Sequence, residues 1–174
     1  MRKTKKITLS AMIVALSTVF MVLGAVIEVL DLSVCALASM MVCFVYIEIG
    51  SPYTWLVWLC TTLTTFVCFP GSVVWIEYFL IFGIYPILKA YIERLPRKFW
   101  LIIKLMFINA IIWLLMFAVE YILGIPFFAV DEIWLKAAIY LLMNVAFIAY
   151  DLFITVLVRF YFEKLRHRFK NLLK

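Results

Sequence analysis

Few polar side chains interrupt the long apolar stretches of this sequence, and these are the residues that could do chemistry. One of them is Glu77, which lies between Trp75 and Tyr78 in the stretch "WIEY". A carboxylate within an apolar helix is costly, and it normally faces a cavity or the interior of a helix bundle. It can bind a cation there, and aromatic neighbours add stacking or cation–π attraction. We therefore predict that Trp75, Glu77 and Tyr78 contact a ligand.

Two later stretches carry polar residues at helical spacing. Residues three or four positions apart share one face of a helix, and the two faces are Asn109, Trp113, Met116 and Glu120, then Tyr140, Asn144, Phe147 and Asp151. From these two faces we predict further ligand contacts in addition to Glu77. They are Asn109, Trp113, Glu120, Tyr140 and Asn144.

A structural interpretation of these residues stays open. An intramembrane Asn often links two helices by a hydrogen bond, at about 0.6 kcal/mol. Trp and Tyr often anchor a helix at the membrane interface. For Asp151 the position favours an internal partner, either a Tyr hydroxyl or the basic inner end, over an external ligand.

The composition places these residues in a membrane protein. Apolar residues make up 68% of the 174 residues, mean hydropathy is +1.16, and only 15% are charged, against about 25% in a soluble domain. Continuous apolar runs, rather than short alternating ones, indicate helices and not a barrel. The predicted fold class is an all-α integral membrane protein with a single membrane domain over residues 1–174.

The lengths of the stretches that lack charged residues predict six membrane spans. The stretch 53–92 would be about 60 Å long as one helix, twice the bilayer core, so it must turn at "FPGS". The predicted spans are 7–27, 32–49, 53–68, 73–92, 99–123 and 133–159, followed by a basic tail over 160–174.

Lys and Arg predict the orientation, because they gather on the cytoplasmic side. With six spans, of the 16 basic residues only Lys136 falls outside. The acidic residues at the opposite face are Glu28, Asp31, Glu120, Asp131 and Glu132. Both termini are therefore predicted to be cytoplasmic.

Several kinds of function lack a signal in the sequence. There is no phosphate-binding glycine loop, nucleophile elbow or paired-histidine motif, and the cysteines lack metal-ligand spacing. The basic residues flank the spans, which topology and anionic lipid explain better than nucleic acid. We predict no enzyme activity, no catalytic residue, no cofactor, no metal and no nucleic-acid partner.

Two small residues remain, Ala11 and Ala15, one helical turn apart in "TKKITLSAMIVALS". The opening stretch, the length and the six spans make the chain resemble the S component of an energy-coupling factor (ECF) type ABC importer. The later stretch "FGIYPILKAYIERL", from Phe82 to Leu95, also looks like the end of the fourth helix in members of this family.

The resemblance implies a function and partners. An S component captures a vitamin or other micronutrient at the outer face of a cell membrane, here expected to be bacterial. It works with a transmembrane coupling subunit and ATPase subunits, and Ala11 and Ala15 would meet the coupling subunit. "IEY" and Asn144 are similar to the thiamin-binding branch, but the fifth span lacks the His expected there.

Three other classes stay open. A scaffold subunit similar to the rod-shape protein MreD would offer a groove for partner helices and bind no small molecule. A secondary carrier would need alternating access, and no inverted repeat or charged midplane site is evident. A membrane-embedded enzyme would need a catalytic cluster.

Overall fold

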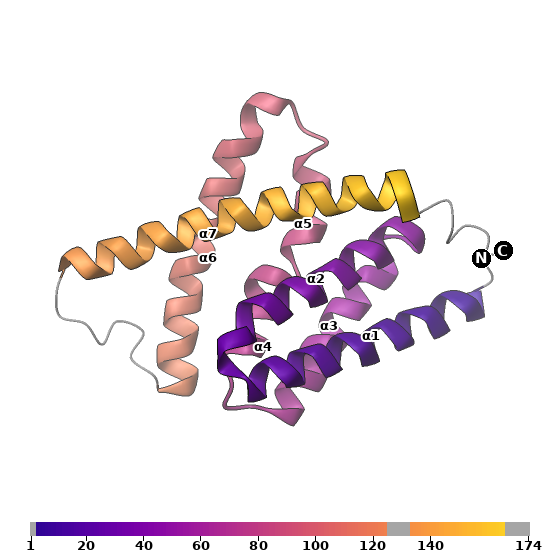
Figure 1. The fold of residues 1–174 in the computed structure, drawn as a ribbon, viewed down its shortest axis with the longest axis horizontal. Helices are drawn as coiled ribbons and strands as arrows, with labels where there is room; N and C mark the ends of the chain where they lie inside the picture. Colours follow the sequence, from indigo (N-terminus) through magenta and orange to yellow (C-terminus); the bar gives the residue numbers. More distant parts are fainter. Residues whose placement is uncertain (1–2, 125–132, 166–174) are drawn as a thin grey trace.

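The computed structural model describes residues 3–124 and 133–165, and every regular element in them is helical (Figure 1). The prediction of an all-helical chain is confirmed for these residues. The remainder of the predicted tail, 166–174, and the acidic residues Asp131 and Glu132 lie outside the described part.

The first three helices form the tightest part of the fold. They are α1 (Lys3–Val26), α2 (Asp31–Glu48), which follows the short turn η1 (Glu28–Leu30), and α3 (Ser51–Cys68). Gly24 lets α1 approach α2 closely, since a Cβ at this position would lie 3.3 Å from Val34 Cβ. Thr18 and Thr64 link α1 to α3 through a 2.8 Å hydrogen bond between their hydroxyl groups.

The next helix is a bent rod built from three pieces. It consists of α4 (Val74–Glu77), the π-helical turn η2 (Tyr78–Phe82) and α5 (Tyr85–Ile92). The chain turns into it at Pro70 and Gly71, where the sequence predicted a break. Its buried side chains, including Tyr78 and Tyr85, pack with α2 residues in the main core.

Two long helices complete the described chain, α6 (Arg97–Leu123) and α7 (Ile133–Phe160), and α7 continues into the π turn η3 (Tyr161–Leu165). In Figure 1, α7 crosses in front of α6 and runs towards the side where α1 begins. Many of their apolar side chains are exposed, among them Trp113, Phe117 and Trp134.

Within the described residues, five helices are long and apolar enough to cross a membrane: Lys3–Val26, Asp31–Glu48, Val74–Ile92, Lys98–Leu123 and Ile133–Lys164. Helix α3 is not among them. Its five threonines, with Ser51 and Pro52, lower its hydropathy, although it has the length of α2.

Candidate functional site

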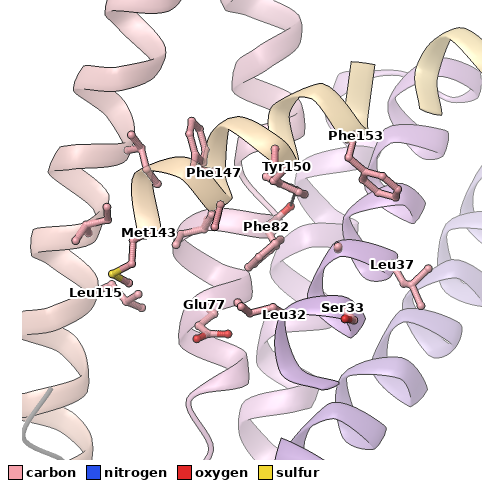
Figure 2. Close-up of a pocket in the computed structure, with 16 residues that line it drawn as sticks. Leu32, Ser33, Leu37, Glu77, Phe82, Leu115, Met143, Phe147, Tyr150 and Phe153 are labelled. Atoms are coloured by element: carbon pink, nitrogen blue, oxygen red, sulfur yellow. Dashed lines mark hydrogen bonds between the residues drawn. The ribbon is translucent and has the colours of Figure 1, made fainter. Parts of the chain in front are cut away.

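A cavity of about 590 Å³ lies between α2, the bent rod, α6 and α7 (Figure 2). This volume is within the range of about 300–1,000 Å³ that small-molecule sites occupy. Its walls are almost entirely apolar, with Phe82, Phe147 and Phe153 among them. The walls can therefore hold an apolar or aromatic molecule.

Glu77 is the one ionisable carboxyl group among the described residues that line this cavity. It is partly buried, and its Oε2 atom is buried without a hydrogen-bond partner in the described structure. In Figure 2 it lies at the lower side of the cavity, below Phe82 and beside Leu32. An unpaired buried oxygen costs about 1–3 kcal/mol, which a ligand's donor or positive charge would offset.

The π turn explains how the bent rod presents this residue. The Gly83 N–H donates to the Tyr78 carbonyl, five residues earlier, at 2.7 Å. The wider turn puts Glu77, Ile81 and Phe82 on one face, and all three line the cavity. Turns of this kind occur frequently at functional sites.

Two side chains from other helices bond the carbonyls that this turn disturbs. Because Gly83 bonds to Tyr78, the Phe79 carbonyl loses its usual α-helical donor, and Trp58 Nε1 on α3 donates to it at 3.2 Å. Pro86 has no N–H to offer the Phe82 carbonyl, and the Tyr150 hydroxyl on α7 donates there at 3.2 Å. Side chains of α3 and α7 thus hold the turn that follows Glu77.

The other two predicted ligand contacts in "WIEY", Trp75 and Tyr78, do not line the cavity. Trp75 donates from Nε1 to the Pro70 carbonyl at 3.1 Å and packs edge-on against Phe66. Tyr78 is fully buried in the main core. In this conformation of the chain, both support the helix that carries Glu77.

The amide and tyrosine residues of α6 and α7 meet one another instead of the cavity. Tyr140 donates a hydrogen bond to Asn109 Oδ1, and Asn109 Nδ2 donates to the Leu105 carbonyl at 2.7 Å. Asn144 Nδ2 donates to the Tyr140 carbonyl at 3.0 Å. This arrangement corresponds to the structural interpretation of these residues, although ligand contact after rearrangement stays a prediction.

Trp113 and Glu120 are exposed on α6 and do not line the cavity. Of the eight predicted ligand contacts, the structure therefore places Glu77 alone in the cavity wall. The remaining wall comes from apolar residues such as Ala36, Ile112 and Met143. Apolar residues are so frequent in this chain that their sequence offers no signal for these positions.

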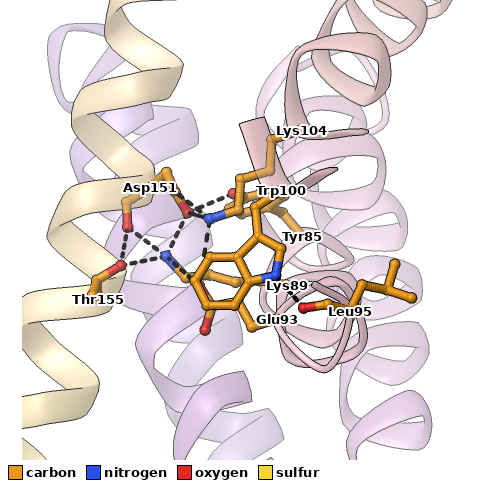
Figure 3. Close-up of polar contacts among 8 residues, drawn as sticks. All are labelled: Tyr85, Lys89, Glu93, Leu95, Trp100, Lys104, Asp151 and Thr155. Atoms are coloured by element: carbon orange, nitrogen blue, oxygen red, sulfur yellow. Dashed lines mark hydrogen bonds and ion pairs between the residues drawn. The ribbon is translucent and has the colours of Figure 1, made fainter. Parts of the chain in front are cut away.

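Asp151 has internal partners of both predicted kinds (Figure 3). Tyr85 donates to Asp151 Oδ1 at 2.6 Å, and Lys104 contacts the two carboxylate oxygens at 3.0 and 2.9 Å. Lys89 bonds to the same carboxylate and to Thr155 Oγ1 at 2.6 Å. Four charges, with Glu93 the fourth, join α5, α6 and α7.

Ala11 and Ala15 lie on the exposed side of α1. The buried residues of this helix are Ser10, Ile13, Ser17, Met21 and Gly24, which form another face. The two alanines are therefore free to meet a partner, and they do not pack inside the described chain.

The described residues contain no group of three or more His, Cys, Asp or Glu side chains that could hold a metal ion. Cys35 and Cys43 are buried and Cys60 and Cys68 exposed, all as free thiols. No protein-family model matches the chain, and no curated protein or solved structure matches it either. The fold and site define an all-helical protein with membrane-compatible helices and a ligand-sized apolar cavity.

Proposed function

We propose that this protein is a membrane-embedded solute-capture subunit, the S component of an ECF-type importer. The observation that carries the proposal is the cavity of about 590 Å³ with the buried, unpartnered Oε2 atom of Glu77 in its wall. Such a site suits reversible capture of a small molecule, because apolar walls supply affinity and one polar group fixes orientation.

We also propose six spans, with α3 as the least apolar of them, and both termini in the cytoplasm. Lys6 near the start of α1 donates to the Ile49 carbonyl at 3.4 Å, and Tyr161 after α7 donates to Glu48 at 2.9 Å. The start of α1 and the end of α7 therefore meet the same end of α2. An even number of crossings puts both ends of a chain on one side, and the basic residues here favour the cytoplasmic side.

The exposed alanines support a separate coupling partner. Small side chains let two helices approach closely in a membrane, and Ala11 and Ala15 are exposed on α1. We propose that this surface meets the transmembrane coupling subunit, which associates with ATPase subunits. The plasma membrane, in a bacterium, is the location that this function requires.

The test is to identify small molecules that the purified protein retains. Protein purified in mild detergent is denatured, and the extract is compared by mass spectrometry with one from Glu77→Gln protein prepared in parallel. We expect one defined molecule to be enriched in the wild-type extract. The same molecule should bind to the purified protein again when it is titrated in. Enrichment of no molecule, with a stable complex of partner membrane proteins instead, would favour the scaffold function.

A further inference from the structure

The mouth of the cavity lies between α2 and α7, on the side of the helix bundle. Leu37 on α2 and Phe153 on α7 line the cavity and are 42% and 45% exposed. Figure 2 shows these two side chains together on the side away from Leu115 and Met143. Ala36 and Ala149, also in the wall, are too small to close the space between the helices.

This position decides what surrounds the opening. If α2 and α7 span the bilayer, their exposed side chains face lipid tails, and so does the gap between them. A molecule that passes through the gap must dissolve in the hydrocarbon region. Water-soluble molecules would have to reach the cavity from the aqueous end of the bundle.

The charge around Glu77 decides what the inner end of the molecule must carry. Glu77 carries the one carboxyl group among the described residues of the wall, and its Oε2 atom is buried without a hydrogen-bond partner in the described structure. Lys89 and Lys104 are already bonded to the carboxylate of Asp151. An unpaired carboxyl group in this wall therefore favours a cation, and the apolar walls favour a hydrocarbon or aromatic body.

We propose that the cavity binds an amphiphile with an apolar body and one positively charged nitrogen, and that this ligand enters sideways between α2 and α7. The inference rests on the proposed capture function and adds the chemical class of the ligand and its route. The ammonium group pairs with Glu77, while the body lies along Phe147, Phe153 and Ala36.

The test uses a dodecylamine that carries a photoreactive diazirine in its chain, with the protein in lipid nanodiscs. Adducts are mapped by mass spectrometry, and excess dodecylamine, dodecanol or dodecanoate serves as competitor. We expect adducts on Phe153 and neighbouring wall residues, with dodecylamine competing at least about tenfold better than the other two, a difference of about 1.4 kcal/mol. Adducts on Met12, an exposed residue of α1, report simple lipid contact and should resist competition.

Two variants test the route and the charge. Ala149→Trp fills the gap and should reduce the competable adducts at least about tenfold, whereas Leu152→Trp, at an exposed α7 position outside the wall, should not. Glu77→Gln should abolish the preference for dodecylamine. Circular dichroism and thermal unfolding verify that each variant is folded.

The outcomes separate this inference from the capture function. Equal competition by dodecylamine, dodecanol and dodecanoate would overturn the ligand class, because the cavity would then be an unselective groove for lipid tails. Retention of a water-soluble molecule that Ala149→Trp does not disturb would overturn the lateral route and leave the capture function standing. Absence of both competable adducts and a retained molecule would overturn both proposals.

Discussion

Lys104 on α6 holds both carboxylate oxygens of Asp151 on α7, at distances of 3.0 and 2.9 Å from its Nζ atom. Lys89 on α5 bonds to Oδ1 of the same carboxylate. The side chains of Lys89, Lys104 and Asp151 are 5%, 11% and 19% exposed. One carboxylate therefore joins three helices, and it is the closer charge partner of each lysine, since Glu93 lies 3.6 Å from Lys89 and 3.4 Å from Lys104.

The first prediction follows from this dependence. Asp151→Asn should lower the free energy of unfolding by about 3–5 kcal/mol, because two buried lysines then share the partly exposed Glu93, at 3.6 and 3.4 Å, as their charge partner. Unfolding in mixed detergent micelles, followed by circular dichroism, measures the loss. Glu163→Gln is the matched control, since Glu163 is exposed and such a change stays within about 0.5 kcal/mol.

A combined variant tests the cause of that loss. Replacing Lys89 and Lys104 by Met in the Asp151→Asn protein removes both buried positive charges, so most of the stability should return. Glu93 is then left alone, but its side chain is 34% exposed and keeps contact with solvent. Failure to regain stability would assign the effect to lost hydrogen bonds of the lysines, such as the one from Lys89 to Thr155.

The second prediction concerns the π turn beside the cavity. A Cβ at Gly83 would lie 2.3 Å from Trp58 Cδ1 and 2.9 Å from the Tyr78 carbonyl oxygen. The indole has little room to move, because it stacks on Phe79 with ring centroids 5.0 Å apart. Gly83→Ala should therefore destabilise the protein by about 1–3 kcal/mol through overpacking.

Gly71→Ala is the control for this change, because it makes the same substitution where nothing lies within 4 Å of the new Cβ. Thermal unfolding of the two variants in one detergent gives the comparison. Equal unfolding temperatures for both variants would show that Trp58 does not constrain the turn.

The third prediction concerns Glu77 in the cavity wall. Glu77→Gln should weaken binding of the physiological ligand by at least about tenfold, or about 1.4 kcal/mol, because it removes the charge but keeps the shape. Titration calorimetry of the retained ligand measures this, with Glu163→Gln as control.

Unchanged affinity of Glu77→Gln would move this residue to a structural role. The aromatic and Asn positions of α6 and α7 would then be the next candidates. Tyr140→Phe would test them first, since it removes the hydrogen bond to Asn109.

The fourth prediction concerns the exposed alanines of α1. Ala11→Trp or Ala15→Trp should leave folding and ligand binding intact and abolish association with the coupling subunit, because close helix approach needs small side chains. Copurification of the partner measures association. Leu56→Trp, at an exposed position on α3, should have no effect, and lost ligand binding in a variant that still assembles would contradict the assignment.

The fifth prediction concerns the energy supply. The sequence has no nucleotide-binding motif, so purified protein should not hydrolyse ATP, and proteoliposomes that contain it alone should not accumulate solute. Addition of the coupling and ATPase subunits should restore uptake. Accumulation against a gradient by the chain alone would make a secondary carrier the better description.

The sequence by itself determined the helical class and the position of most helices. Hydropathy and the break at "FPGS" are local properties of the chain, so they predict where α1, α2, α6 and α7 lie and where α3 ends. It also identified Glu77 as a candidate ligand contact and internal partners for Asp151, because an ionisable group in an apolar helix carries a large desolvation cost.

Tertiary structure decided which residues surround the cavity and which polar residues bond to one another. Spacing along one helix shows which residues share a face, but not which helix that face meets. Asn109 and Tyr140 therefore satisfy each other across α6 and α7, while apolar residues of α2 such as Leu37 line the cavity. The π turn is also a tertiary effect, since Trp58 and Tyr150 from other helices bond the carbonyls that it and Pro86 leave free.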